Sequence, residues 1–170
     1  MRLSKSFLLS EFLVSGVARR NGLKLNPPKK DITSLMILCQ RLLQPLRDKI
    51  RGPIRINSGW RSIELNKLLG GSYREKKNDD GSITKIYSQH CRGEAADIKY
   101  VDKNGRMDNK LLYDTIIDSG LEFDQMINEF NYSWIHISYS KDNNRNQILE
   151  AYKDEKGKTK YKVPDKYNSL

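Results

Sequence analysis

The chain has 170 residues, of which 31 are Lys or Arg and 21 are Asp or Glu, giving a formal net charge of +10 at pH 7. This length is typical of one domain and leaves little room for a second core. No apolar run approaches the roughly 20 residues of a membrane-spanning helix, so such a span is excluded. The excess positive charge favours an anionic partner without identifying it.

The first part of the chain is predicted to be helical. Ser10 is a candidate cap for a short helix that ends near Arg20, and Asn26-Pro27-Pro28 then interrupts the chain. Asp31 is a candidate cap for a longer helix with an apolar stripe at three-to-four-residue spacing. The stripe consists of Leu35, Leu38, Leu42 and Leu46. Pro45 lies within this stripe and should kink the helix or end its regular part.

The middle of the chain alternates between strand and helix patterns. A short strand is predicted at 54–57, a helix at 62–69 and another strand at 95–98. The stretch 70–86 is polar and rich in Gly, Lys and Asp, so we expect a loop there.

The last part of the chain is predicted to contain one helix and two hairpins. Asp108 should cap a helix that runs to Ser119 and stops at Gly120. Strands are predicted at 125–130 and 134–138, and a final hairpin should pair 148–152 with 159–163. Because helices come first and antiparallel strands later, the predicted fold class is α+β, with N-terminal helices packed on a small antiparallel sheet.

The N-terminal sequence MRLSKSFLLSEFLVSG resembles a signal peptide, with Arg2 and Lys5 ahead of apolar residues. However, Ser10 and Glu11 interrupt the apolar stretch, and no small-residue cleavage motif follows. We therefore interpret this segment as part of the fold. The protein is expected to accumulate in the cytoplasm unless an export or lysis system releases it.

His90 and His136 are the only histidines in the chain. Imidazole and carboxylate groups are suitable zinc ligands, and three protein ligands leave a fourth position for water. His90 and Asp97 can converge if the chain turns at Gly93 and returns as a strand, and His136 would come from the distant hairpin. On spacing alone, the alternative that both histidines are ordinary polar or core residues stays open.

Four sequence segments occur together in a distinctive order. They are Ile56–Ser62 continuing to Leu65-Asn66, Ser88-x-His90-x-x-Gly93-x-Ala95-x-Asp97, Phe123–Ile127, and Trp134-x-His136. Together they resemble the zinc D-Ala-D-Ala carboxypeptidase family, peptidase family M15. Relatives of that family include phage L-alanyl-D-glutamate endolysins, vancomycin-resistance dipeptidases and the Hedgehog signalling domain.

The resemblance covers residues from about 7 to 140. It implies one domain over 1–170 with a Hedgehog/DD-peptidase-like fold. The core of this domain is expected at about 7–140, and its C-terminal part, about 141–170, is a basic hairpin and tail. It also implies that His90, Asp97 and His136 bind one Zn²⁺ per chain. Zinc lowers the pKa of a bound water to about 7 and polarises a carbonyl group, which is the chemistry of peptide hydrolysis.

The resemblance further assigns Arg61 a role in catalysis and substrate binding, because a guanidinium binds carboxylates bidentately and stabilises an oxyanion. Without the motif, Arg61 reads as a surface residue at a helix start. Ser88 is expected to form a hydrogen bond near His90 and to border the substrate. The alternative for Ser88 is a plain serine at a strand end.

One position departs from the family pattern. Much of the family carries an acidic general base three residues before the last histidine, and here that position is Ser133, whose hydroxyl is too weak a base. Glu129 is the preferred substitute, because it shares a sheet face with His136 if residue 129 pairs with 134. A one-residue shift of register would turn Glu129 away. Asp124 is the second candidate.

The sequence therefore predicts a zinc peptidase that hydrolyses peptidoglycan stem peptides, of the D,D-carboxypeptidase or L-alanyl-D-glutamate endopeptidase type. A phage or prophage protein, freed by lysis or carried in the virion, is the expected source, and anionic cell-wall polymers are further candidate partners. The alternative is a catalytically inactive, zinc-containing peptidoglycan-binding or virion module. Nucleic-acid binding ranks lower because only the charge supports it. The sequence does not determine the bond cleaved or the oligomeric state.

Overall fold

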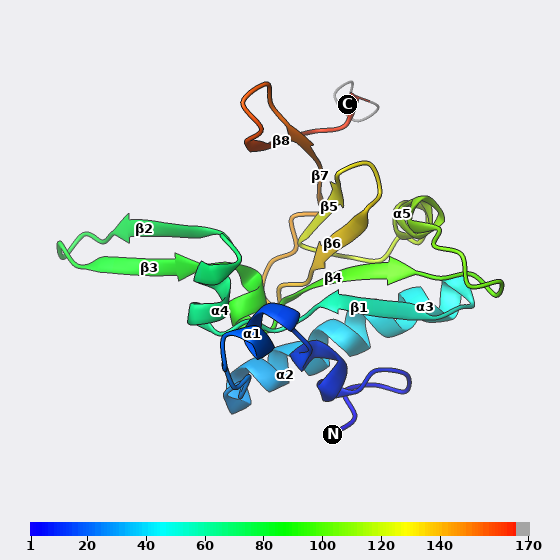
Figure 1. Cartoon of the computed structure of the whole chain (residues 1–170), viewed down its shortest axis with the longest axis horizontal. Helices are drawn as coiled ribbons and strands as arrows, with labels where there is room; N and C mark the ends of the chain where they lie inside the picture. The colour runs from blue at the N-terminus through cyan, green and yellow to red at the C-terminus, as the bar shows by residue number, and fades with distance from the viewer. Residues whose placement is uncertain (166–170) are drawn as a thin grey trace.

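A computed structural model describes residues 1–165, which form a six-stranded sheet, a separate two-stranded hairpin and several helices (Figure 1). The strand order in the large sheet is β1-β4-β6-β5-β7-β8. Its strands are β1 (Ile54–Ser58), β4 (Ala95–Tyr100), β5 (Gln125–Glu129), β6 (Trp134–Ser138), β7 (Gln147–Lys153) and β8 (Thr159–Lys162). All neighbours are antiparallel except β5 and β7, which are parallel. The α+β fold class is confirmed.

The helical elements precede or interrupt these strands. The α-helices are α1 (Gly16–Arg20), α2 (Lys29–Leu38), α3 (Gln44–Ile50), α4 (Ile63–Leu68) and α5 (Asn109–Asp118). Three shorter helical segments are η1 (Leu9–Leu13), η2 (Cys39–Leu43) and η3 (Gln89–Arg92). Within residues 1–165, no helix has the length and apolar character needed to cross a bilayer.

The prediction of one short helix ending near Arg20 is wrong, because the chain forms two short helical segments there, η1 and α1. The chain is extended at Val14 and Ser15, between η1 and α1. Ser15, not Ser10, caps α1 by accepting a hydrogen bond from the Ala18 amide. The break lets Phe12 enter the core, whereas α1 buries only Ala18.

The long helix is also corrected at its start. It begins at Lys29, so Asp31 lies within the first turn and does not cap it. Asp31 is buried and accepts a hydrogen bond from the indole Nε1 of Trp60. Near Pro45 the irregularity is confirmed, but the chain stays helical by widening at η2, where the Gln44 amide bonds to the Cys39 carbonyl. A wider turn accommodates a residue that has no N–H to donate.

The predicted loop at 70–86 is wrong. Its residues form strands β2 (Tyr73–Lys77) and β3 (Ile83–Tyr87), which pair with each other and project from the body of the molecule (Figure 1). Both strands are largely exposed, so their polar composition is that of a ribbon solvated on both faces. The Tyr73 and Tyr87 rings, 5.2 Å apart, pack across the base of this hairpin.

Alternation along the strands separates the core from a polar face. On the core side are Ala96, Ile98 and Tyr100 of β4, Ile135 and Ile137 of β6, and Met126 of β5, together with α2, α3 and α5. The intervening residues, among them Asp97, His136 and Glu129, face the other way because side chains of a strand alternate between faces. The sheet therefore presents a row of polar groups on the face opposite its helices.

The other predicted elements are confirmed. Ser62 and Asp108 cap α4 and α5 through hydrogen bonds to the amides of Leu65 and Leu111. The hairpin of β5 and β6 pairs Glu129 with Trp134, as the sequence requires for Glu129 to face the side of His136. The final hairpin exists as β7 and β8, and the end of the predicted tail, 166–170, lies outside the described residues.

Gly93 has a steric reason to be glycine. It ends η3 with a φ of 71°, and a Cβ there would lie 2.3 Å from the carbonyl oxygen of Asp31 in α2. We predict that Gly93→Ala lowers the free energy of unfolding by about 2–4 kcal/mol, from the left-handed backbone and the overpacking together.

The matched control is Gly105→Ala, at a φ of 80° with nothing within 4 Å of the added Cβ. It should lose only the backbone contribution, about 1–2 kcal/mol. Urea unfolding of the two variants measures both losses. Equal losses would contradict close packing of Gly93 against α2.

Candidate metal centre

Three side chains converge on the polar face of the sheet and are named here the His-Asp-His cluster: His90, Asp97 and His136. Nε2 of His90 lies 3.2 Å from Nδ1 of His136 and 3.3 Å from Oδ1 of Asp97. Nδ1 of His136 and Oδ1 of Asp97 are 3.0 Å apart. The structure thus brings together the three residues proposed from sequence as metal ligands.

Strand register and one short turn build this cluster. Asp97 of β4 pairs directly with His136 of β6, so their side chains emerge side by side on one face. His90 comes from η3, just before β4, and the left-handed Gly93 turns the chain back into the strand. Residues separated by 46 positions therefore meet through one cross-strand pair and one turn.

The cluster fits a zinc ion in both ligand type and spacing. Nitrogen and oxygen ligands lie about 2.0–2.2 Å from zinc, so ligands of a tetrahedral site are about 3.3–3.5 Å from each other. The three separations in the cluster are within a few tenths of an ångström of this value. His90 and Asp97 are buried and His136 is half-buried, so the cluster is open on one side only.

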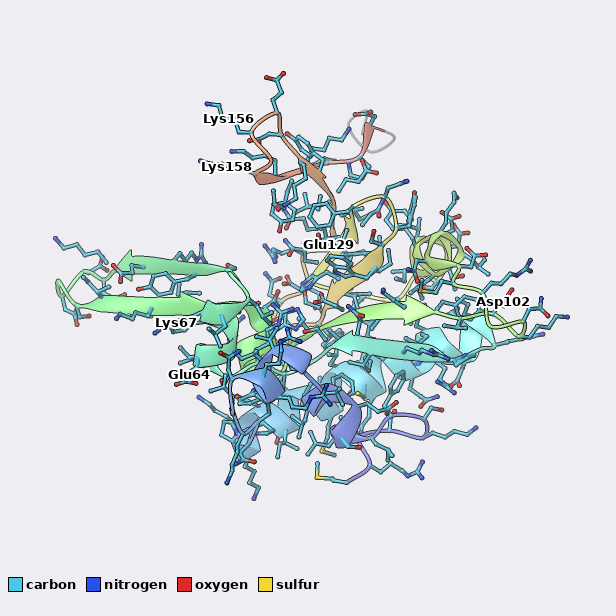
Figure 2. All side chains as sticks on the ribbon, viewed as in Figure 1. Glu64, Lys67, Asp102, Glu129, Lys156 and Lys158 are labelled. Atoms are coloured by element: carbon cyan, nitrogen blue, oxygen red, sulfur yellow. The ribbon has the colours of Figure 1, made fainter. Side chains whose placement is uncertain are left out.

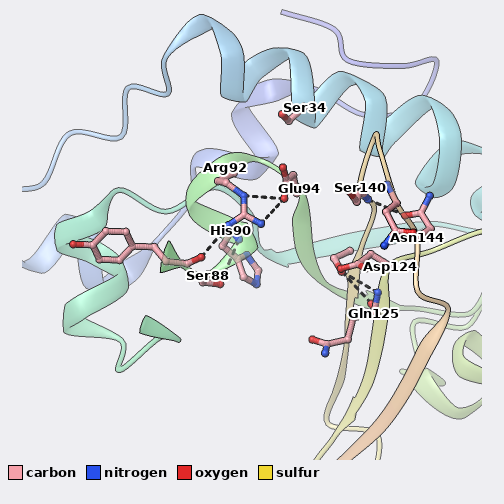
Figure 3. Close-up of polar contacts among 12 residues, drawn as sticks. Ser34, Ser88, His90, Arg92, Glu94, Asp124, Gln125, Ser140 and Asn144 are labelled. Carbon is pink, nitrogen blue, oxygen red and sulfur yellow. Dashed lines mark hydrogen bonds and ion pairs between the residues drawn. The ribbon is translucent and has the colours of Figure 1, made fainter. Parts of the chain in front are cut away.

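Hydrogen bonding orients His90 for metal binding. Its Nδ1 lies 2.7 Å from the carbonyl oxygen of Gly59, which accepts a hydrogen bond when Nδ1 carries the proton. That tautomer leaves Nε2 free as a ligand, the arrangement usual for metal-binding histidines. Ser88 caps the η3 turn by accepting a hydrogen bond from the His90 amide (Figure 3). Ser88 thus helps to fix the backbone of His90, and it also borders the cleft.

The protonation states of the cluster suit a metal. Burial raises the pKa of Asp97, but the imidazoles of His90 and His136 outweigh burial and hold this pKa well below its usual range. Burial also lowers the pKa of His90, which favours its neutral form. A carboxylate and a neutral imidazole are the forms that bind zinc.

Arg61 holds the second oxygen of Asp97. Its Nη2 donates to Oδ2 of Asp97 at 2.7 Å, and its Nε and Nη2 donate to Oγ of Ser58. Arg61 therefore orients the carboxylate so that Oδ1 points to the histidines. Within residues 1–165, Nη1 of Arg61 has no protein acceptor, and the side chain borders the cleft.

The segment around Arg61 connects the cluster to the core. Trp60 donates its backbone N–H to Phe12 and its indole N–H to Asp31. Gly59 packs so tightly that a Cβ would lie 2.5 Å from Cα of Phe12. The Arg61 amide in turn donates to the carbonyl of His90. Each residue of the motif therefore fixes part of the site or anchors it to the N-terminal segment and α2.

Glu129 lies on the cleft face of β5, near the centre of the molecule (Figure 2). It is 8% exposed, and within residues 1–165 its carboxylate forms no hydrogen bond or ion pair. Burial raises its pKa above the usual range, with the nearby His136 acting in the opposite direction. A carboxylate that is close to the cluster and free of partners can accept a proton.

The other two positions considered for a base are placed differently. Asp124 forms a bidentate pair with Arg145, at 2.6 and 2.7 Å, and also accepts a hydrogen bond from Ser138. Burial raises the pKa of Asp124, and the Arg145 guanidinium more than offsets that increase. Ser133 is exposed in the turn between β5 and β6, where its hydroxyl donates to the Phe130 carbonyl. Of the three, Glu129 alone combines proximity with a free carboxylate.

The cluster opens into a cleft of about 1340 Å³. The cleft is bordered by residues of the β2–β3 hairpin and of the β7–β8 hairpin, which project in different directions from the sheet (Figures 1 and 2). Three aromatic residues that border the cleft were not singled out from the sequence: Tyr87, Phe130 and Tyr161. The strand pattern around Tyr161 was visible, but only the pairing of distant strands shows which face it occupies.

Residues 5–138 match a protein-family model described as Peptidase M15. The matched stretch contains the whole His-Asp-His cluster together with Arg61 and Glu129, and it ends before β7. No curated protein matches the chain.

We predict that Asp97→Asn reduces zinc affinity at least about tenfold, because a neutral amide replaces the charged ligand. His90→Ala and His136→Ala should have the same effect. Competition with a chromophoric chelator measures the affinity, and elemental analysis after dialysis measures the zinc content.

The matched control for this prediction is Asp124→Asn, which neutralises another buried carboxylate of the same cleft outside the cluster. It should retain one zinc per chain. Equal zinc loss in Asp97→Asn and Asp124→Asn would contradict the assignment of the ligands.

Proposed function

The chain belongs to peptidase family M15, and from this we propose that it is a zinc-dependent peptidase that hydrolyses the stem peptides of peptidoglycan. The observation that carries the proposal is the His-Asp-His cluster at the floor of a cleft, beside the unpartnered carboxylate of Glu129. Members of this family are generally zinc-dependent. His90, Asp97 and His136 would hold the ion.

When bound, zinc supplies Lewis-acid activation of water and of the peptide carbonyl. Glu129 accepts a proton from the attacking water as the new carbon–oxygen bond forms. It then delivers that proton to the amine nitrogen as the carbon–nitrogen bond breaks, so the same carboxylate acts first as base and then as acid. The raised pKa of Glu129 suits this double role.

Arg61 has two tasks in this proposal. Its Nη2 holds Asp97, and Arg61 also borders the cleft, where Nη1, which has no acceptor within residues 1–165, is a donor for a substrate carbonyl or carboxylate. A charged donor in a confined site binds an oxygen more strongly as negative charge develops on it. Arg61 thus connects the ligand shell to the substrate.

The cleft and the charge support a peptidoglycan substrate. At about 1340 Å³ the cleft exceeds the roughly 300–1,000 Å³ of typical small-molecule sites and suits a segment of extended peptide. The net charge of +10 favours encounter with the anionic cell wall. The small size and the sequence resemblance to phage-type relatives support a role in lysis or in the virion.

Mass spectrometry of muropeptides digested by the zinc-loaded protein tests the proposal and identifies the bond. Loss of a terminal D-alanine indicates a D,D-carboxypeptidase, and a cut after L-alanine indicates an L-alanyl-D-glutamate endopeptidase. If the zinc-loaded protein binds sacculi but releases no products, it is instead an inactive peptidoglycan-binding module.

We predict that Glu129→Gln lowers kcat at least a hundredfold, because the amide cannot accept a proton, while zinc content stays at one per chain. The matched variant is Asp124→Asn, which removes the charge of the other candidate base. Release of amino termini from peptidoglycan measures both. Full activity of Glu129→Gln with loss in Asp124→Asn would move the base to Asp124.

We predict that Arg61→Ala raises KM about tenfold or more, the expected effect of losing a charged hydrogen bond to the substrate. Arg55→Ala is the control, since it removes an exposed guanidinium from the nearby strand β1. Steady-state kinetics at saturating zinc compare the two. An unchanged KM in Arg61→Ala would remove its role in substrate binding.

A further inference from the structure

We propose that Tyr161 of β8 binds the substrate by donating a hydrogen bond from its phenol to a peptide oxygen, a carbonyl or a carboxylate. This inference rests on the proposed function and adds a residue from outside the matched stretch 5–138. It makes the β7–β8 hairpin part of the substrate site.

Strand pairing places Tyr161 in one row with Glu129. In the sheet, Trp134 pairs with Glu129, Glu129 with Ala151, and Ala151 with Tyr161. Residues paired directly across strands project from the same face. Trp134, Glu129 and Tyr161 accordingly all border the cleft.

The distances along this row allow Tyr161 to reach the site. Neighbouring strands are about 4.8 Å apart, so the Cα atoms of Tyr161 and Glu129 are separated by about 10 Å. Between them stands Ala151, whose side chain is a single methyl group. A tyrosine side chain spans most of that distance, and within this row only the small Ala151 lies between the phenol and Glu129.

The phenol is a free donor. Tyr161 is 53% exposed, and within residues 1–165 its hydroxyl has no hydrogen-bond partner. Partial burial, together with the carboxylates of Glu129 and Asp97, raises its pKa above the ordinary value of 10.0. The hydroxyl therefore stays protonated at neutral pH and presents a proton to the cleft.

Tyr161 and Arg61 lie on either side of the His-Asp-His cluster, toward opposite edges of the sheet. Arg61 follows β1 at one edge, Tyr161 lies on β8 at the other, and the cluster and Glu129 occupy the strands between. Stem peptides offer many carbonyl and carboxylate oxygens and can accept hydrogen bonds from both. A substrate held at two points across the cluster would place its scissile bond between them.

The test compares Tyr161→Phe with Tyr152→Phe, each of which removes one hydroxyl. Tyr152 pairs with Lys160, so it lies on the opposite face of the same hairpin, and it does not border the cleft. Both substitutions are made in the Glu129→Gln protein, and binding to purified sacculi is measured by cosedimentation. This readout does not require turnover.

Tyr161→Phe should weaken binding about three- to tenfold, the effect of one lost hydrogen bond, with unchanged melting temperature and zinc content. Tyr152→Phe should bind like its parent. In the Glu129-containing protein, Tyr161→Phe should raise KM by a similar factor.

If Tyr161→Phe binds like its parent while the parent binds sacculi and the wild type cleaves them, the Tyr161 assignment is overturned and the proposed function stands. If only Tyr161→Ala weakens binding, the ring and not the hydroxyl is responsible, which also overturns the hydrogen bond. If the parent does not bind sacculi and the wild type releases no products, both proposals fail.

Discussion

The site depends on the direct pairing of Asp97 with His136 across β4 and β6. This register sets a carboxylate oxygen and an imidazole nitrogen 3.0 Å apart, and the turn through Gly93 brings His90 to the same point. A slip of one residue would turn Asp97 into the core and Ala96 or Ile98 toward the cleft. The apolar residues on the other face of β4 oppose such a slip, so packing of the core also fixes the positions of Asp97 and His136.

The segment from Ser58 to Ser62 connects the core to the His-Asp-His cluster. Trp60 anchors it to Phe12 and Asp31, and Arg61 holds the outer oxygen of Asp97. One short segment therefore holds both His90 and Asp97, whereas His136 is positioned by its strand, β6. In the proposed function, preorganised donors of this kind would stabilise developing charge without reorganisation.

The hairpin of β5 and β6 bears on the choice of Glu129 over position 133, where much of the family carries its acidic base. Ser133 lies in an exposed turn whose preceding residues Phe130, Asn131 and Tyr132 all have positive φ. Glu129, at the end of β5, lies on the cleft face, and its carboxylate has no hydrogen-bond or ion-pair partner within residues 1–165. The proposed base therefore comes from strand β5 and not from the turn of the same hairpin.

The α+β class, the helix at 62–69, the cap at Asp108 and the hairpin of β5 and β6 could be predicted from the sequence, because caps and alternation are local properties. The grouping of His90, Asp97 and His136 came from the family resemblance, since their spacing alone left other roles open. The prediction failed at 70–86, since a ribbon solvated on both faces has the composition of a loop. It did not single out Tyr161 as a residue of the cleft, although the strand that carries it was predicted. The face that each strand presents and the order of the strands became known only from the folded structure. Pairing in a sheet joins segments far apart in the chain and depends on the packing of the whole core.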